Sequence, residues 1–483
     1  MNTVGVDDVC RHSYHVSWLK KYLDAASWLT FEIYAMRIVL VVVACMTALS
    51  NPFAHAADVP PNIVVLLCDD LGYGDLACFG HPQIKTPNID RLASEGLKLT
   101  HCYAAAPVCS PSRGGLLTGR NPYRLGIRDW IPAQSGVFLR PGEVTVPQLL
   151  RTAGYQTCHV GKWHLNSRIN GSEPTPGDAG FDYWMYTQNN AAPNHLDPTN
   201  FVRMGKQIGK QSGPSSHVIV QEAMSWLDKT ENRPFYLNVW FHEPHEKIAA
   251  EDKYVDLYPG EADPDRRHYM ADVSQMDAAV GRLMQYLDEH GLRETTFVFF
   301  SSDNGPETKN RYQGSERSQG SPGPFRGMKL HLSEGGIRVP GVMRWPGQIR
   351  PGTESTQPVC SVDLLPTFCA LAGIRPPQDR SLDGASLLPL FEGRPIQRSH
   401  PLYWQYDKAL NLPWVVALRD GPWKLLANQQ LDRFQLFNLE QDPGEQVDLA
   451  SERADQVASL AALMKTLHTE INQDGAKSGN PIP

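Results

Sequence analysis

The sequence lacks the two features that would assign it to nucleic acid or to a membrane. Its 483 residues carry 45 lysines and arginines against 52 aspartates and glutamates, which gives a net charge of −7. That balance argues against a basic nucleic-acid binder, so we expect no nucleic-acid partner. The apolar run at 38–48 is shorter than the ~20 residues that a bilayer-spanning helix needs, so we expect no stable membrane insertion.

Residues 1–56 are predicted to be a leader outside the fold. From Met36 the chain carries a positive Arg37, the short apolar run and a small-x-small site ending at Ala56, which is typical of a signal peptide. We therefore expect the true start at Met36, cleavage after Ala56 and a periplasmic or secreted protein. The alternative is cleavage before a lipidated Cys45.

Cysteine is scarce, and no pair has zinc-site spacing. Two of the nine cysteines lie in the predicted leader. Setting aside Cys109, which a motif described below singles out, six remain, an even number that would suit disulfides in an oxidising compartment. The alternative is that these six are buried free thiols. The nine are Cys10, Cys45, Cys68, Cys78, Cys102, Cys109, Cys158, Cys360 and Cys369.

Strand patterns alternate with amphipathic helix patterns over most of the chain, which predicts an α/β fold with a mainly parallel sheet sandwiched by helices. Near residue 394, short turn-separated strand patterns replace this alternation, and a helix pattern follows at 451–471. We therefore predict a main domain at 57–393 and a smaller C-terminal domain, antiparallel sheet plus helix, at 394–483. Other expected elements are strands at 62–68, 155–160, 235–241, 295–300 and 339–344 and helices at 86–96, 218–227 and 269–290.

Two groups of polar residues follow predicted strands. Asp69 and Asp70 come directly after the strand at 62–68, and Asp303 and Asn304 follow the strand at 295–300. Ligands of an open parallel sheet bind at the carboxyl ends of its strands, although each group alone could be a surface turn. Together the four hard oxygen ligands predict a site for calcium or, as the second choice, magnesium, and they do not suit zinc.

The segment Cys-Ser-Pro-Ser-Arg at 109–113, continued by Leu-Thr-Gly at 117–119, carries a family signature. It resembles the type I sulfatases, whose pattern is Cys-x-Pro-Ser-Arg followed by Leu-Thr-Gly. The resemblance covers about residues 61–449 and is closest to the arylsulfatase and N-acetylgalactosamine-6-sulfatase branch. It implies an alkaline-phosphatase-like fold. Further matching motifs are Gly-Lys-Trp-His-Leu at 161–165, Arg-Gly-x-Lys at 326–329, Glu-Gly-Gly at 334–336 and the tail at 436–445.

The resemblance implies that a maturation enzyme oxidises Cys109 to formylglycine, which also joins the metal ligands. The hydrated aldehyde is a geminal diol, so one hydroxyl can attack sulfur and the other can expel sulfate as the aldehyde re-forms. A serine would instead need water to attack the covalent ester at sulfur, which is a slower route. The alternative is a structural cysteine at the start of a helix.

The same resemblance assigns roles to four further catalytic residues. Arg113, one helical turn into the motif, would reach back to the diol and the metal-bound carboxylates. Lys162 and His164 flank Trp163 in an extended segment, so their side chains can face one site. By resemblance, Lys162 contacts formylglycine and sulfate, His164 takes the second diol proton, and Lys329 is a second sulfate-binding lysine.

The remaining catalytic residue is the general acid, for which the resemblance indicates His245. The family has a Pro-His pair at this point, and Pro244 precedes His245. His242 is the alternative, because Lys247 stands where related sequences often carry proline. We expect sulfate and the nearby anions to favour the protonated form of His245.

The sequence therefore predicts a sulfuric ester hydrolase that acts on a sulfated saccharide and is activated by a formylglycine-generating enzyme. One alternative is a phosphodiesterase or phosphatase of the same fold, which would need a second metal and a serine or threonine nucleophile. The other is a catalytically silent, secreted carbohydrate-binding protein. No catalytic position of the family pattern is missing, which argues against a silent protein.

Overall fold

The computed structural model describes residues 60–230 and 233–481. The predicted leader, with its signal peptide, lies outside the described residues. Within the described ranges, no helix is long and apolar enough to cross a membrane. The residues from Pro60 onward form one compact unit.

An eleven-stranded mixed sheet forms the centre of this unit, with the order β10-β2-β9-β8-β1-β7-β3-β4-β5-β6 and with β11 also paired to β2. The five inner strands from β8 to β4 are parallel, whereas β9 runs antiparallel to β2 and β8. The strands are β1 (Asn62–Cys68), β2 (Leu97–Tyr103), β3 (Gln156–Lys162), β4 (Tyr183–Thr187), β5 (Val202–Arg203), β6 (Lys206–Gln207), β7 (Phe235–Trp240), β8 (Thr296–Ser302), β9 (Arg338–Arg344), β10 (Thr353–Ser355) and β11 (Val359–Cys360).

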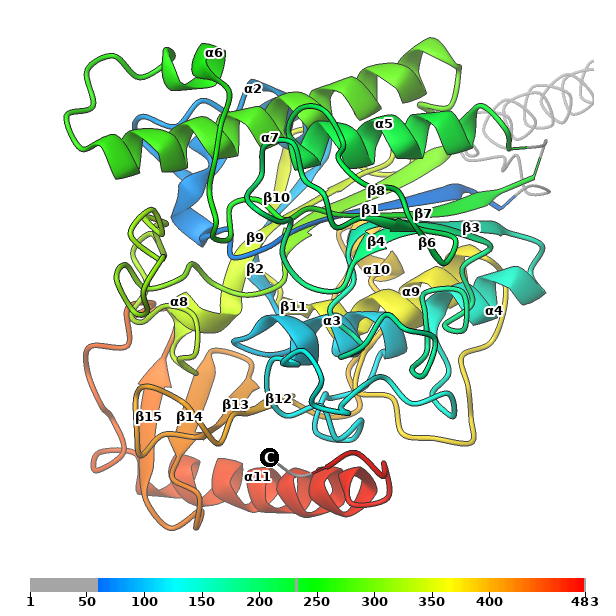
Figure 1. Cartoon of the computed structure of the whole chain (residues 1–483). Coiled ribbons are helices and arrows are strands. Elements are labelled where there is room, and N and C mark those ends of the chain that lie inside the picture. The colour runs from blue at the N-terminus through cyan, green and yellow to red at the C-terminus, as the bar shows by residue number, and fades with distance from the viewer. Residues whose placement is uncertain (1–59, 231–232, 482–483) are drawn as a thin grey trace, which may run out of the picture. The chain divides into compact units, whose positions relative to one another are not determined.

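Helices cover both faces of this sheet, as Figure 1 shows, so the predicted α/β architecture is confirmed. One layer contains α2 (Pro87–Ser94), α5 (Ser215–Leu227), α6 (Asp252–Val255) and α7 (Pro264–Glu289). The other contains α3 (Cys109–Thr118), α4 (Val146–Thr152), α9 (Leu364–Leu371) and α10 (Leu388–Phe391), while α8 (Glu334–Ile337) precedes β9.

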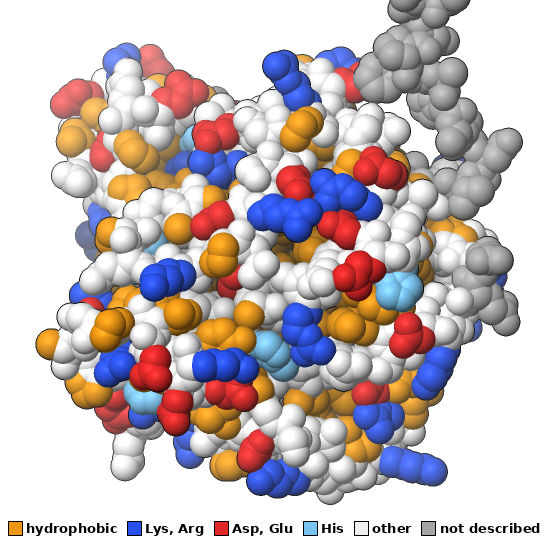
Figure 2. Space-filling model, turned by 90° about the horizontal axis from the view of Figure 1, so that it is seen from above, with side chains coloured by type: hydrophobic (Ala, Val, Ile, Leu, Met, Phe, Trp, Pro, Cys, Tyr) orange, Lys and Arg blue, Asp and Glu red, His pale blue; other side chains and the backbone are white. Residues whose placement is uncertain are grey.

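The continuously apolar strand β1 lies between two hydrophobic cores. Val64 and Leu66 belong to the core under α5 and α7, whereas Val65 and Leu67 belong to the core under α3 and α9. Successive side chains of a strand point to opposite faces, so a strand buried on both faces needs apolar residues at every position. The outer face above α5 and α7 carries acidic and basic side chains intermixed, in keeping with the absence of a basic composition (Figure 2).

A second sheet, antiparallel, has the order β12-β13-β14-β15 and packs with one long helix, α11 (Ala454–Gly475). Its core also includes Tyr103, Val108 and Cys109 of the main part, so apolar packing continues from the second sheet to the start of α3. The boundary at 393/394 stays a prediction. The strands are β12 (Leu402–Gln405), β13 (Val416–Asp420), β14 (Trp423–Ala427) and β15 (Phe434–Asn438).

The described cysteines settle one alternative that the sequence left open. All seven, from Cys68 to Cys369, are free thiols, and all but Cys78 are buried. Buried cysteine behaves as a small apolar residue, and most of these positions lie among apolar neighbours in the hydrophobic cores. The buried-thiol interpretation is therefore the correct one for the described part of the chain.

Candidate active site

Four oxygen-bearing side chains meet at the carboxyl ends of β1 and β8. These parallel strands are neighbours in the sheet, so the residues that follow them emerge side by side. The Asp70 amide donates to Asp303 Oδ1 at 3.2 Å, and Asn304 Nδ2 donates to Asp70 Oδ1 at 2.7 Å. With Asp69, these residues are at most 2% exposed. The structure thus brings the four predicted metal-binding side chains of the two strand ends together.

Cys109, the first residue of α3, lies within the same cluster. Its sulfur forms one group of closely spaced ligand atoms with Asp69 and Asp303 and another with Asp70 and His245, all within 4.8 Å in each group. Burial raises the pKa of the Cys109 thiol to about 12. The unmodified thiol is therefore protonated at neutral pH and is a weak nucleophile.

Helix α3 holds Arg113 against the cluster. Pro111 stands in its first turn, where a missing N–H is tolerated, and the helix ends where Gly119 adopts a left-handed φ of 66°. Arg113 Nε donates to Asp303 Oδ2 at 2.8 Å, and Nη2 lies 2.6 Å from the same oxygen. The guanidinium also lies 5.2 Å from the centre of the Trp240 ring. Arg113 is fully buried, so its charge depends on these partners.

Two lysines complete the set of buried charges. Lys162 Nζ lies 2.6 Å from Asp69 Oδ2, and Lys329 Nζ lies 2.7 Å from Asp70 Oδ1. Burial works to raise the pKa of Asp69, but Lys162 and the other neighbouring cations outweigh it and hold that pKa well below its usual range. Burial raises the pKa of Asp303 to about 7, because its cationic neighbour compensates less.

The donor set fits a divalent cation. Asp69 Oδ1 and Asn304 Oδ1 are buried and have no hydrogen-bond donor among the described residues, although Arg113 Nη2 is 3.4 Å from Asp69 Oδ1. A buried acceptor without a donor costs free energy unless a cation or water satisfies it. Carboxylate and amide oxygens are the ligands that calcium and magnesium prefer.

His164 lies close enough to Lys162 for that charge to affect its pKa, but its φ of 56° is left-handed and not extended as the sequence predicts. The backbone of Trp163 and His164 continues the pairing of β3 with β4, and Trp163 packs on Trp240 with ring centroids 6.0 Å apart. His164 Nε2 lies 3.2 Å from the Ile131 carbonyl, and its Nδ1 is buried without a partner among the described residues. Burial, then Lys162, lowers the pKa of His164 well below its usual range, so the ring is neutral.

The two candidate acids occupy different surroundings. His245 Nε2 lies 3.5 Å from Asp70 Oδ2, and its Nδ1 faces the Glu246 carbonyl at 2.7 Å. His242 is fully buried, and its Nε2 lies 2.7 Å from Thr187 Oγ1. His245 is therefore the histidine that the structure brings to the Cys109 cluster, and it keeps 12% of its side chain exposed.

Without bound sulfate the ring of His245 is neutral, and its protonation in the presence of sulfate stays a prediction. Burial, followed by the charge of Lys329, lowers the pKa of His245 to about 3, although Asp69 opposes this shift. The sequence could not reveal the burial of the ring or the position of the lysine. The ring therefore becomes a proton donor only if a bound anion raises its pKa.

Two residues near the cluster carried no recognisable motif. Asn190 Oδ1 accepts a hydrogen bond from Lys162 Nζ at 3.1 Å, and it lies in a loop without periodicity. His195, fully buried, pairs with Asp272 of α7 at 3.0 Å, and its amide donates to the Lys247 carbonyl in the His245 loop. The sequence contained one indication of this pair: Asp272 stands on the apolar face of a predicted helix, where a buried acid requires a partner.

Comparison with family models identifies this arrangement. The model described as Sulfatase matches residues 61–374, and the model described as N-sulphoglucosamine sulphohydrolase, C-terminal, matches residues 328–475. The first match alone spans more than half of the chain and contains every predicted site residue.

Sequence and structure comparisons agree with the family models. The human N-acetylgalactosamine-6-sulfatase is 34% identical over 376 residues, covering 73% of this chain and 69% of that protein. The rat steryl-sulfatase is 33% identical over 449 residues, covering 75% and 76%. The solved structure of Ps i-CgsB in complex with k-i-k-neocarrahexaose superposes with a TM-score of 0.78 at 27% identity, covering 88% of this chain and 95% of that chain.

The fold and site thus define an enzyme of the alkaline-phosphatase-like architecture that hydrolyses sulfate esters. The chain belongs to the sulfatase family. The resemblance to the type I sulfatases is confirmed, whereas the roles of the individual site residues stay predictions.

The buried His195–Asp272 pair predicts a pH dependence of stability. Burial lowers the pKa of His195, but Asp272 outweighs it, with help from Glu243 and Glu246, and raises that pKa to about 9. A raised pKa stabilises the fold fully below the unfolded value of about 6.5, and this contribution disappears as the pH rises through about 9. The free energy of unfolding should fall by about 3 kcal/mol across this window.

Urea unfolding at several pH values measures this change. His195→Gln should abolish most of the pH dependence in that window, while His400→Gln, in the C-terminal part, should keep it. An unchanged pH dependence in His195→Gln would show that the pair is not charged.

Proposed function

We propose that this enzyme removes sulfate from a sulfated carbohydrate, using a formylglycine made from Cys109 by a maturation enzyme, in the periplasm or outside the cell. The observation that carries the proposal is the position of Cys109, buried among carboxylates and lysines with a thiol pKa of about 12. Such a thiol has little use as a nucleophile in itself. The carbohydrate substrate is supported by the relatives named N-acetylgalactosamine-6-sulfatase and by the neocarrahexaose in a similar structure.

We further propose that Asp69, Asp70, Asp303 and Asn304, together with the oxidised Cys109, hold one divalent cation. Calcium suits the site better than magnesium, because three carboxylates and an amide form an oxygen-rich set and magnesium usually retains several waters. When bound, this cation would stabilise negative charge on the sulfuryl oxygens.

The remaining residues divide the work of binding and proton transfer. As a hydrate, formylglycine would supply a hydroxyl nucleophile and a second hydroxyl through which the aldehyde is restored. Lys162 and Lys329 bind the sulfate oxygens, and Arg113 fixes the carboxylates in place. His164 is neutral, so its free Nδ1 can accept a proton from the group at position 109.

His245 would give its proton to the departing sugar oxygen. The negative charge of a bound sulfate ester favours the protonated ring and opposes the effects of burial and Lys329. The phosphatase alternative is disfavoured by family membership, since the chain matches the Sulfatase model. The silent-protein alternative is disfavoured because the candidate residues cluster as the proposed chemistry requires.

The metal proposal predicts that chelation stops sulfate release and that added calcium restores it. Asp303→Ala should lower kcat by at least ~10²-fold, because the variant loses a cation ligand and leaves Arg113 only its longer contact with Asp69. Asp256→Ala, at an exposed surface carboxylate, is the matched control. Elemental analysis should find one calcium per wild-type chain. Two zinc ions per active chain would instead support the phosphatase alternative.

The acid assignment predicts a dependence on the leaving group. His245→Ala should slow hydrolysis of a sugar sulfate by ~10²-fold or more, because an alkoxide leaves poorly without a proton. The same variant should slow 4-nitrocatechol sulfate much less, since that phenol leaves readily. Equal losses on both substrates would give His245 a binding role. A sugar-selective loss in His242→Ala alone would transfer the role to that residue.

A further inference from the structure

The segment at 128–131 lies directly against the active site. The Ile131 amide donates to Ser110 Oγ at 3.0 Å, and Ser110 is the neighbour of Cys109. The Ile131 carbonyl lies 3.2 Å from His164 Nε2. One residue thus contacts both the start of α3 and His164, which fixes the preceding residue, Trp130, at the edge of the site.

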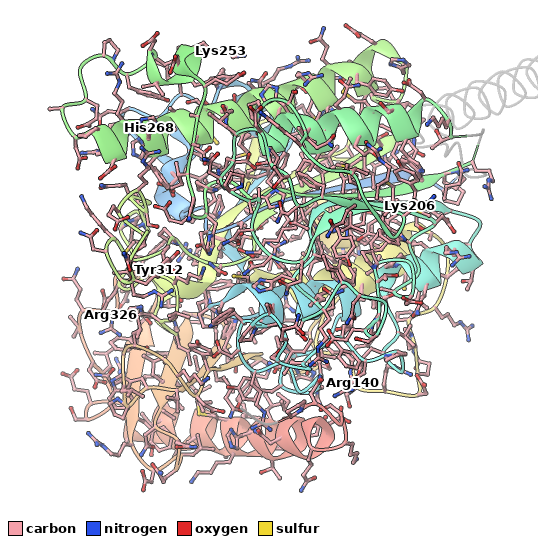
Figure 3. The ribbon with its side chains drawn as sticks, viewed as in Figure 1. Arg140, Lys206, Lys253, His268, Tyr312 and Arg326 are labelled. Carbon is pink, nitrogen blue, oxygen red and sulfur yellow. The ribbon has the colours of Figure 1, made fainter. Side chains whose placement is uncertain are left out.

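Trp130 leaves a large apolar ring exposed at this edge. The residue is 45% exposed, and its ring centroid lies 6.5 Å from that of His164. Tyr312, labelled in Figure 3, is a second exposed aromatic residue, at 36%. The Arg311 guanidinium lies over the Tyr312 ring at 5.0 Å, whereas no cation of the described residues lies over the Trp130 ring.

A charged pair is formed by Asp129, the residue before Trp130. Asp129 Oδ1 accepts hydrogen bonds from the Trp130 amide at 2.8 Å and from Tyr406 Oη at 2.9 Å. Asp129 Oδ2 lies 2.9 Å from Lys408 Nζ, and the Lys408 side chain is 58% exposed. The exposed ammonium retains donors for a ligand, because one carboxylate oxygen satisfies only part of its capacity.

The segment that carries Lys408 also reaches the sulfate-binding side of the site. The Leu410 amide donates to the Leu330 carbonyl at 3.0 Å, and Leu330 follows Lys329. A series of contacts therefore connects His164, through Trp130, Asp129 and Lys408, with the backbone next to Lys329.

We propose that Trp130, Asp129 and Lys408 form a sugar subsite, in which Trp130 stacks on the pyranose that carries the sulfate and the charged pair binds its hydroxyl groups. This inference rests on the proposed function. The C–H face of a pyranose is apolar and slightly positive, so it complements the negative face of an aromatic ring. The hydroxyls at its edge can donate to the carboxylate and accept from the ammonium.

The Asp129–Lys408 pair makes a saccharide a better ligand for this subsite than a sterol or a plain aryl group. An apolar ligand would also cover the Trp130 ring, but it would remove water from Asp129 and Lys408 without replacing any hydrogen bond. A hydroxylated ring replaces those bonds. The combination of an aromatic face and a hydrogen-bonding edge thus selects a hydroxylated ring.

The test compares two substrates in the full-length, matured enzyme. The substrates are the hexose or hexosamine sulfate that the wild type hydrolyses fastest and 4-nitrocatechol sulfate. Trp130→Ala should raise KM for the sugar sulfate by ~10-fold with a smaller change in kcat, and Trp130→Phe should restore most of the loss. Lys408→Met should raise the same KM by several fold. Leu463→Ala, at an exposed apolar residue of α11, is the matched control.

The outcomes separate this inference from the function on which it rests. If the wild type releases sulfate from no saccharide, the proposed function fails and the subsite fails with it. If the wild type hydrolyses the sugar sulfate but Trp130→Ala leaves its KM unchanged, or changes kcat/KM equally for both substrates, the subsite alone is overturned. The subsite is supported if the ratio of kcat/KM for the sugar sulfate to kcat/KM for the aryl sulfate falls in Trp130→Ala and recovers in Trp130→Phe.

Discussion

The structure depends on the mutual neutralisation of six buried charges. Three carboxylates face three cations, and the side chain of each residue is at most 4% exposed. Removing such charges from water costs several kcal/mol per ion unless partners replace the water, so the loss of one member leaves another unpaired. The three contacts are Arg113 with Asp303, Lys162 with Asp69 and Lys329 with Asp70. We propose that this cluster binds sulfate, and the rest of the fold must offset the free energy that its burial costs.

The fold offsets this cost through the arrangement of its strands and through the packing of its cores. The neighbouring parallel strands β1 and β8 bring the carboxylates together, and the apolar residues of β1 bury that strand between two cores. The core of the second sheet includes Cys109 and Val108, so packing at the far end of the chain also fixes the start of α3. Position 109 is therefore held by contacts from distant parts of the sequence, as its proposed role of nucleophile requires.

The sequence predicted what local pattern determines. The continuous apolar run predicted β1, and the position of Asp69 and Asp70 directly after it predicted their place at the site. The Cys-x-Pro-Ser-Arg motif identified Cys109 and Arg113. The sequence did not predict interactions that depend on tertiary structure. The His195–Asp272 pair joins residues 77 positions apart, and Trp130 belongs to no motif. The pKa of His245 without substrate depends on burial and on Lys329, neither of which the sequence shows. Free thiols could not be separated from disulfides without distances.

The central claim is that position 109 acts as formylglycine and not as cysteine. The most direct measurement is the mass of the peptide containing residue 109, taken from protein made with a maturation enzyme and compared with the sulfatase activity of the same sample. The account predicts that activity rises with the fraction of that peptide carrying formylglycine, and that Cys109→Ala folds but loses at least ~10³-fold in activity. Fully active enzyme whose peptide contains only unmodified cysteine would contradict it.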